Sequence, residues 1–543
     1  MYKRRIMHHN CNQSIDASSS IETMSSDIFK TLAQTFPISC ASDEFYFFPQ
    51  IRLAETQWEV WDGYSKESIA ELVRRISRWE NELDQRNFLS INQTEKIDIA
   101  LLKKLIRTLG EQLSEVRMWE YQPSFYLTLS CIGLAEAIES TDSLAIQNRI
   151  KTLPAFLDQA CQNLDNVPIL FRDIGLEMIA DTRDYYIHLA KEFPELNDSL
   201  TALDRFDEKV RHVSTRKDFL LPKDLVKRIV YTHINCGLDI HDIHQILDRE
   251  IDDMRHILNQ EAKKIIPEKT ATRCSGSLWS DALKRIPTPF IGKAGVIGLY
   301  QNEVKRLTEH CIAHGLASPE LAISCPVHVS PMPPFLSAIR ASSSYSIRPE
   351  YPSSGGTFYI ISRHEDHREY RMLAAHETYP GHHLLDASRW NLTQSCRRAI
   401  EQPIFYEGWA CFAEELLRVT GYFSTPADRL LLAKRRLWRA IRGKVDLGLQ
   451  IGTIDLKTAA RHLRGTGITI ERALSSARKY PLNPGYQLCY SIGLHTFMDM
   501  FHRYGSNNLN GFIHTILHHG EINFIDLEKL LKNSNSNYKN KKD

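Results

Sequence analysis

The sequence predicts a mainly α-helical protein with a small β element. Apolar residues recur at helical spacing over much of the chain, most clearly after residues 92–95, which have the pattern of a capping box; this helix is expected to stop at Gly110. One short segment, Thr357 to Ser362, is a candidate strand. Further helices are predicted over residues 65–85, 222–235, 240–262 and 430–450.

The two ends and one internal segment interrupt the helical pattern. Residues 1–40 are at first rich in Ser, Asn and His and are predicted to be a flexible N-terminal segment. Residues 325–356 contain six prolines and directly precede the candidate strand, so a long loop is expected there. Residues 531–543 are polar and of low complexity, which predicts a disordered tail.

The composition is that of an ordinary globular protein. Of the 543 residues, 24% are charged and 43% apolar, and the net charge is +1. This charge gives no electrostatic basis for binding nucleic acid or an anionic membrane, so neither is expected as a partner. The eleven cysteines form no C-x-x-C pair, which favours reduced thiols. No signal core follows the basic start, and no apolar run approaches the about 18 residues of a membrane span. These features predict a cytoplasmic protein.

The most informative segment is His376-Glu377-Thr378-Tyr379-Pro380-Gly381-His382-His383, with three imidazoles and one carboxylate. Twenty-five residues after His382 lies an isolated acid, Glu407, among apolar residues. Two His and one Glu are the ligand set of hydrolytic zinc sites that leave a fourth position open for water. The carboxylate beside the first His, Glu377, is then available as a general base. The pattern predicts a zinc hydrolase.

The spacing of the histidines requires a break in the helix. Residues at i and i+4 share a helix face, but position i+4 from His376 is Pro380, which cannot bind a metal and disfavours helix before it. On a straight helix His382 would lie about 240° round, and His383 would face correctly but lie about 10.5 Å away. A kink at Pro380-Gly381 is therefore expected. We take His382 as the second ligand, with His383 as the alternative.

The segment resembles the hallmark H-E-x-x-P-G-H-H of the domain-of-unknown-function family 885, and residues 407–410 resemble that family's E-G-W-A. That family is similar to helical zinc peptidases of the oligopeptidase and angiotensin-converting-enzyme type, where a Glu ligand follows the second His at about this distance. Aligning the Gly-His pairs makes His382 and Glu407 the matching ligands. Three further segments resemble the family in the same order: residues 237–244, 356–360 and 484–493.

The resemblance covers roughly residues 230–500. It implies a large helical zinc-peptidase-like fold with a central cleft and a small strand element next to the metal-binding helix. We expect a helical scaffold region at 41–225 and a catalytic zinc-binding region at 226–530, packed together as one unit. Nothing in the sequence specifies an oligomeric state.

The predicted cofactor is Zn²⁺, bound by His376, His382 and Glu407, with Glu377 moving the proton. By resemblance, a Tyr in the C-terminal segment stabilises the oxyanion, and Tyr490 matches best, with Tyr486 second. The expected substrate is a peptide or small amide. Alternatives are a zinc amidase or ester hydrolase acting on a non-peptide metabolite, and a non-catalytic relative of the fold.

Substrate contacts are expected outside the metal centre. An extended peptide would pair with the edge of the strand at 356–361. Arg340 and Arg348, in the preceding loop, would meet a carboxylate. His383 would point towards substrate or towards a nearby acid such as Asp386.

Overall fold

A computed structural model of the chain describes residues 20–51, 59–86, 92–140, 142–266, 277–337, 339–340, 342–347, 352–361 and 367–539. The fold is mainly α-helical, as predicted. The N-terminal part contains α1 (Ile21–Thr35), α2 (Pro37–Ala41), α3 (Lys66–Arg86), α4 (Gln93–Glu111), a π-helical turn (Gln112–Val116), α5 (Met118–Tyr121), α6 (Pro123–Ser140), α7 (Ser143–Asn163), β1 (Val167–Pro168), α8 (Ile169–Leu189), α9 (Leu196–His212) and β2 (Thr215–Arg216).

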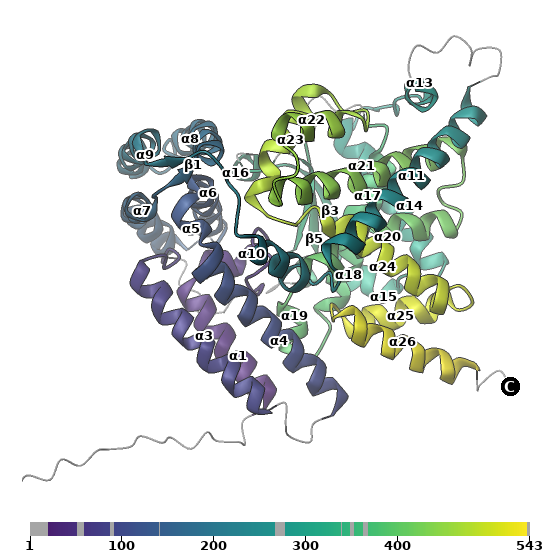
Figure 1. The fold of residues 1–543 in the computed structure, drawn as a ribbon, viewed down its shortest axis with the longest axis horizontal. Coiled ribbons are helices and arrows are strands. Elements are labelled where there is room, and N and C mark those ends of the chain that lie inside the picture. The colour runs from purple at the N-terminus through teal and green to yellow at the C-terminus, as the bar shows by residue number, and fades with distance from the viewer. Residues whose placement is uncertain are drawn as a thin grey trace, which may run out of the picture.

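The remainder contains the elements that build the site. They are α10 (Lys223–Arg228), α11 (Ile240–Ile265), α13 (Leu278–Arg285), α14 (Gly295–Ala313), α15 (Pro319–Ser324), β3 (Val327–Pro331), α16 (Pro334–Ser337), β4 (Ser344–Ile347), β5 (Gly356–Ile360), α17 (Tyr370–Glu377), α18 (His382–Arg389), α19 (Ser395–Ala399), α20 (Pro403–Val419), α21 (Pro426–Gln450), α22 (Leu456–Arg464), α23 (Ile470–Lys479), α24 (Leu488–Met500), α25 (Leu509–His519) and α26 (Phe524–Lys539). Figure 1 shows most helices up to α9 gathered on one side of the molecule and most later elements on the other.

The predicted helices are confirmed. Asn92 caps α4 in a reciprocal capping box with Glu95. Gly110, however, does not stop this helix, because α4 continues to Glu111 and then into the π-helical turn. Glycine inside a helix is only a weak breaker, and here it lies in close contact with the Ile76 side chain, 3.1 Å from where a Cβ would be.

A three-stranded sheet lies in the order β3-β5-β4, with β5 parallel to β3 and antiparallel to β4. Strand β5 confirms the candidate strand. The prediction of a plain loop over 325–356 is wrong, because this segment supplies both outer strands; its proline at the end of β3 is tolerated on an edge strand. Since β5 is central, both of its edges are paired, and the expected addition of a peptide along β5 is also wrong.

Both predictions for the chain ends need correction. Residues 21–41 form α1 and α2 rather than a flexible segment: Ser20 caps α1, and Ile28 and Leu32 are fully buried. Residues 1–19 lie outside the described part of the chain. At the other end α26 continues to Lys539. Leu527 is buried and fixes the start of this helix, and extending a helix that has already formed costs little free energy per residue.

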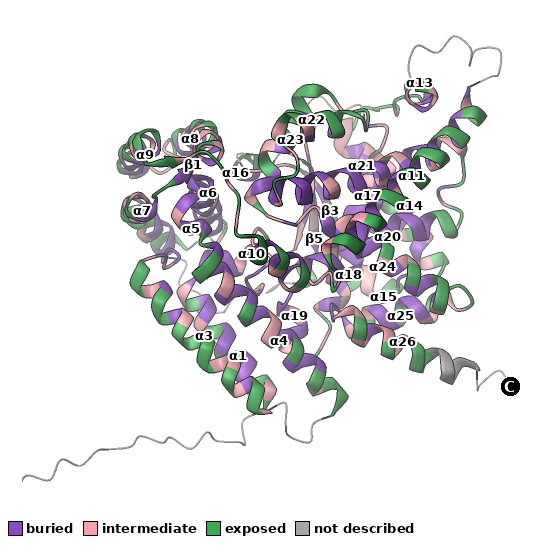
Figure 2. Ribbon diagram, viewed as in Figure 1, coloured by how far each residue is buried: buried purple, intermediate pink, exposed green. Residues whose placement is uncertain are grey.

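The regions predicted as scaffold (residues 41–225) and as zinc-binding (residues 226–530) share one hydrophobic core. Figure 2 shows buried residues gathered on the helix faces turned towards the interior. Polar contacts also cross between the regions: Arg397 lies 2.6 Å from Asp98, and Gln50 donates to Glu401 at 2.6 Å. The two regions therefore support each other's packing. Among the helices of the described residues, none has the length and apolar character needed to cross a bilayer.

Candidate metal centre

The motif folds as two short helices joined by a non-helical turn. Between α17 and α18, Thr378 (φ −121°, ψ −107°) and Gly381 (φ −79°, ψ −134°) leave the helical region. The peptide between Tyr379 and Pro380 is cis. The break predicted at Pro380-Gly381 is confirmed.

Two residues make this turn possible. A Cβ on Gly381 would lie 1.9 Å from the carbonyl oxygen of His376, so only glycine lets the chain return this closely. Trp409, on α20, donates its indole N–H to the carbonyl oxygens of Pro380 at 3.0 Å and Gly381 at 3.2 Å. The indole thus gives the Pro380 carbonyl a partner inside the break and adds a second donor to the Gly381 carbonyl, which also accepts from the backbone N–H of Leu385.

The turn brings His376, His382 and Glu407 together. One candidate ligand atom from each lies within 4.8 Å of the others. His376 Nε2 lies 3.4 Å and His382 Nε2 3.5 Å from Glu407 Oε2. Bonds of about 2.1 Å in a tetrahedral zinc site place ligand atoms about 3.4 Å apart. His382, rather than His383, is therefore the second member of the cluster, as predicted.

The donor set fits a zinc ion. The three side chains are buried, and Glu407 Oε2 has no hydrogen-bond partner although solvent does not reach it. Burial alone would raise the pKa of Glu407, but the two imidazoles hold that pKa well below its usual range, so the side chain is a carboxylate. Two imidazoles and one carboxylate suit zinc, whereas calcium and magnesium prefer oxygen ligands.

A buried carboxylate orients the His376 ring. His376 Nδ1 lies 3.2 Å from Glu414 Oε1, and Glu414 in turn accepts from Arg435 at 3.0 Å and Arg439 at 2.6 Å. Arg439 Nη2 also lies 3.2 Å from His376 Nδ1, but it already donates to Glu414. Donation from Nδ1–H to Glu414 leaves Nε2 free to bind a metal. Sequence reasoning missed Glu414, although an acid two helical turns after Glu407 lies on the same helix face.

Helices α20 and α24 cross at two glycines. A Cβ on Gly408 would lie 2.6 Å from the Cα of Gly493, so neither position tolerates a larger side chain without moving the helices apart. This close crossing places two tyrosines of the C-terminal segment beside Glu407. Tyr486 donates its hydroxyl to Glu407 Oε1 at 3.0 Å, and the Tyr490 ring lies 6.4 Å from the His376 ring, nearly parallel to it.

A cavity of about 460 Å³ opens beside the cluster and is lined by His376, Glu377 and Tyr490 among other residues. Burial, opposed by the charge of His382 and reinforced by that of Glu407, raises the pKa of Glu377 to about 7. Burial, together with the charge of Glu407, also raises the pKa of Tyr490 well above its usual value. Tyr490 is therefore a neutral hydroxyl donor at physiological pH, and Glu377 can exchange a proton there.

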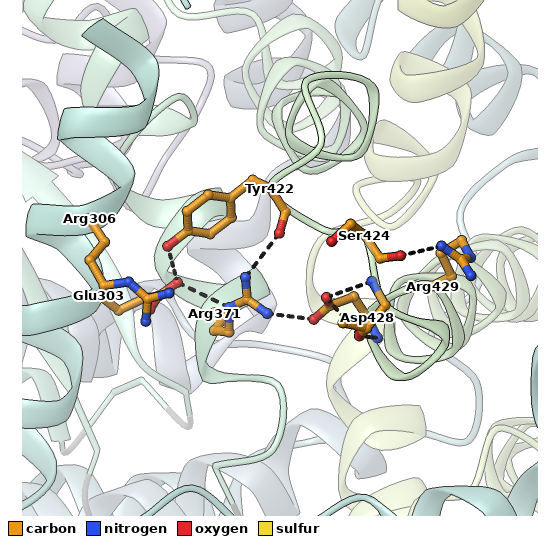
Figure 3. Close-up of polar contacts among 8 residues, drawn as sticks. Glu303, Arg306, Arg371, Tyr422, Ser424, Asp428 and Arg429 are labelled. Carbon is orange, nitrogen blue, oxygen red and sulfur yellow. Dashed lines mark hydrogen bonds and ion pairs between the residues drawn. The ribbon is translucent and has the colours of Figure 1, made fainter. Parts of the chain in front are cut away.

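The helix that carries His376 is anchored by one guanidinium (Figure 3). Arg371, also on α17, donates to Asp428 at 2.6 Å, to Glu303 at 3.3 Å and to the carbonyl oxygen of Tyr422 at 3.1 Å. These partners lie on α21, on α14 and in the turn after α20. Arg371 lies about one and a half helical turns before His376, and its contacts connect this part of α17 to three neighbouring segments.

His383 has a different place from the predicted one. It is fully buried, with Nδ1 2.9 Å from the Tyr345 hydroxyl and Nε2 3.0 Å from the carbonyl oxygen of Cys325. Both ring nitrogens therefore have partners, and the ring links α18 to β4 and to Cys325, two residues before β3. The prediction that His383 faces substrate or Asp386 is wrong, because the turn directs adjacent residues to opposite sides.

The other residues predicted to bind substrate are not free to do so where the structure describes them. Arg340 donates to Glu44 and Asp43, each at 2.5 Å, and to Ser344 at 2.9 Å, so its donors are committed within the protein. Tyr486 is bonded to Glu407 rather than turned to the cavity. Arg348 lies outside the described residues.

Comparisons with known structures show the fold. Two structures, each described as a "putative lipoprotein", come from Shewanella oneidensis (TM-score 0.75, 15% identity) and Colwellia psychrerythraea (TM-score 0.76, 14% identity). Each match covers 95% of this chain and 100% of the other. The M32 carboxypeptidase of Deinococcus radiodurans R1 matches with a TM-score of 0.36 and 11% identity, over 89% of this chain and 96% of that one, which is too weak to support an argument.

These findings overturn the predicted cytoplasmic location. Relatives in fold are described as lipoproteins, and a covalent lipid anchor requires no membrane-spanning helix. Scattered cysteines and the absence of a long apolar run therefore do not establish a cytoplasmic protein. No curated protein sequence matches the chain. The profile of the family DUF885, described as bacterial proteins of unknown function, matches residues 53–530, and the chain belongs to this family.

Proposed function

We propose that the protein is a zinc-dependent hydrolase that cleaves peptide bonds, acting on small peptides. The observation that best supports this proposal is the convergence of three buried donor atoms within 4.8 Å, one of them on His376, which lines a cavity together with Glu377. A zinc ion held by His376, His382 and Glu407 would supply Lewis-acid activation of a water molecule and of the scissile carbonyl.

Glu377 moves the proton in this scheme. Its carboxylate accepts a proton from the attacking water as the new C–O bond forms. It then returns that proton to the leaving nitrogen as the C–N bond breaks, so one water is consumed and Glu377 is regenerated. A pKa near 7 suits both steps, because the group can accept and donate at the same pH.

Tyr490 stabilises the oxygen that gains negative charge. Tyr490 lines the cavity with its ring nearly parallel to that of His376, and its neutral hydroxyl can donate a hydrogen bond to that oxygen. Tyr486 supports Glu407 instead, since its hydroxyl is already donated to that carboxylate. Tyr486, in the turn before α24, and Tyr490, in the first turn of that helix, thus have separate tasks.

The test combines metal content with product identification. Purified protein should contain about one equivalent of zinc, and it should cleave members of a mixed peptide library, with activity lost on chelation and restored by zinc. His382→Ala should abolish both zinc binding and cleavage. Less than half an equivalent of zinc, or cleavage confined to non-peptide amides or esters in a parallel metabolite panel, would refute the proposal.

A further inference from the structure

The cavity beside His376 and Glu377, called here the cationic cavity, is lined by more basic than acidic side chains. Against two carboxylates, Glu369 and Glu377, it presents five cations. Four of them come from one helix, α21, where residues three and four apart share a face. The five are Lys434, Arg435, Arg439, Arg442 and Arg472.

Most of the cations on α21 have carboxylate partners within the protein. Lys434 donates to Glu369 at 2.5 Å, and Arg435 and Arg439 donate to Glu414 at 3.0 Å and 2.6 Å. Their charges are therefore largely neutralised by acids at the cavity wall and behind it.

Arg442 is the exception. It is 7% exposed, and its Nε and Nη2 have no hydrogen-bond partner. Among the described residues it contacts aromatic rings rather than an anion: its guanidinium lies 4.3 Å from the Trp438 ring centre and 3.5 Å from that of Tyr490. Stacking holds the planar group in place but leaves its N–H donors without acceptors, which is costly for a buried cation.

We propose that Arg442 binds a carboxylate of the substrate within the cationic cavity. A guanidinium matches a carboxylate through two parallel N–H···O bonds, and the Nε–H and Nη2–H edge is the one left without partners. The unpartnered Nε and Nη1 of Arg439, one helical turn away, add donors on the same wall. This inference rests on the proposed function, because it specifies the substrate class of the same site.

The geometry limits how far this carboxylate lies from the scissile bond. The Arg442 guanidinium is 3.5 Å from the Tyr490 ring centre, which is 6.4 Å from the His376 ring centre, so Arg442 lies at most about 10 Å from the His376 ring. An extended peptide spans about 3.3–3.6 Å per residue. The carboxylate therefore belongs within about three residues of the bond that is cleaved, as in a short peptide with a free C-terminus.

The experiment measures binding separately from turnover. Full-length Glu377→Gln protein is titrated calorimetrically with three tetrapeptide libraries: free C-terminal acids without Asp or Glu, the same peptides as C-terminal amides, and amides that contain one Asp or Glu. We expect a carboxylate-bearing library to bind at least tenfold more tightly than the neutral amides, and the first and third libraries distinguish a terminal from a side-chain carboxylate. Adding Arg442→Gln should weaken binding of the preferred library about thirtyfold or more and leave the neutral amides nearly unchanged.

Matched variants separate recognition from charge and folding. Lys444→Gln removes the same charge from the same helix, where its partner is Asp248 outside the cavity, and should keep the preference. If Arg442→Gln does not fold, Arg442→Lys is the substitute variant. It retains the positive charge but lacks the planar guanidinium with its two parallel N–H donors, so it should lose part of the preference for the carboxylate-bearing library. Equal binding of all three libraries, no binding of any, or an equal loss for all with Arg442→Gln would overturn the inference. If wild-type protein cleaved the amides and the free acids at equal rates, the inference about Arg442 would fail and the proposed function would stand. If the protein bound the carboxylate-bearing library selectively but cleaved none of the peptides, only the proposed function would fail.

Discussion

At the scale of single residues, His382 and His383 are neighbours in the chain with opposite environments. His382 contributes Nε2 to the metal cluster, and its ring stacks on Tyr406 at 4.0 Å. His383 lies in the core, where burial lowers its pKa to about 4. Of the two adjacent histidines, His382 therefore belongs to the candidate ligand cluster, whereas His383 supports the fold.

The environment of His383 predicts an acid sensitivity. Its folded pKa lies below the usual value of 6.5, so the fold prefers the neutral ring; this stability is present above about pH 6.5 and is lost as the pH falls towards 4. The loss is of the order of 3 kcal/mol. Urea unfolding of metal-free protein at pH 7 and 4.5 should show a smaller drop for His383→Gln than for wild type. Parallel pH dependences in the two proteins would contradict this.

Glu377 provides the second prediction at this scale. Glu377→Gln should keep zinc, because the residue is not in the ligand cluster, and should lower turnover by about 10² to 10⁴. Zinc content and kcat of the same preparation are the measurements. Glu407→Gln is the contrasting variant and should lose the metal. If Glu377→Gln lost zinc while Glu407→Gln retained it, the two roles would have to be exchanged.

At the scale of elements, the break between α17 and α18 and the choice of His382 could be predicted. Pro380 excludes a straight helix, and two ligands of one ion must converge, so local chemistry predicted the break; the preference for His382 over His383 rested also on the resemblance to the family motif. The outer strands β3 and β4 were not predicted, because each is short and the prolines within and around them favour a loop. Glu414 and Arg442 were missed for the same reason: their roles depend on how α20, α21 and α24 pack.

Substitution of two glycines tests separately the turn between α17 and α18 and the crossing of α20 with α24. Gly381→Ala places a Cβ against the His376 carbonyl oxygen and should open the turn, so zinc content should fall. Gly493→Ala places a Cβ 2.3 Å from the carbonyl oxygen of Ile404 and should push α24 away, lowering stability by about 1–3 kcal/mol and reducing kcat through Tyr490, with zinc retained.

The control for both variants is Gly110→Ala, in α4, where a Cβ would meet only the Ile76 side chain. It should leave zinc content and kcat unchanged. Retention of full zinc by Gly381→Ala would show that the turn does not depend on the close approach of Gly381 to His376.

At the scale of the whole molecule, the scaffold and catalytic regions should unfold together, because they share one core. Replacing Arg397 by Met leaves buried Asp98 without its partner at 2.6 Å and should cost about 3–5 kcal/mol. Near-ultraviolet circular dichroism and zinc release during thermal unfolding should shift to lower temperature by the same amount. A zinc-release curve that did not move would show that the two regions unfold independently.

Trp409 has a further consequence for how the metal centre is assembled. Two residues after Glu407, it donates to the carbonyl groups of the turn that separates His376 from His382, so one side chain links the segments that carry all three donors. We expect these contacts to hold the donors in position before a metal binds. Such a preorganised site differs from a zinc finger, in which the ion drives folding. Removing the metal should therefore leave the far-ultraviolet circular dichroism unchanged. Trp409→Phe, which keeps the ring but lacks the N–H, should weaken zinc affinity about tenfold or more at unchanged helix content, as loss of a supporting hydrogen bond does elsewhere. A helical signal that collapses on chelation would show that the ion organises the site instead.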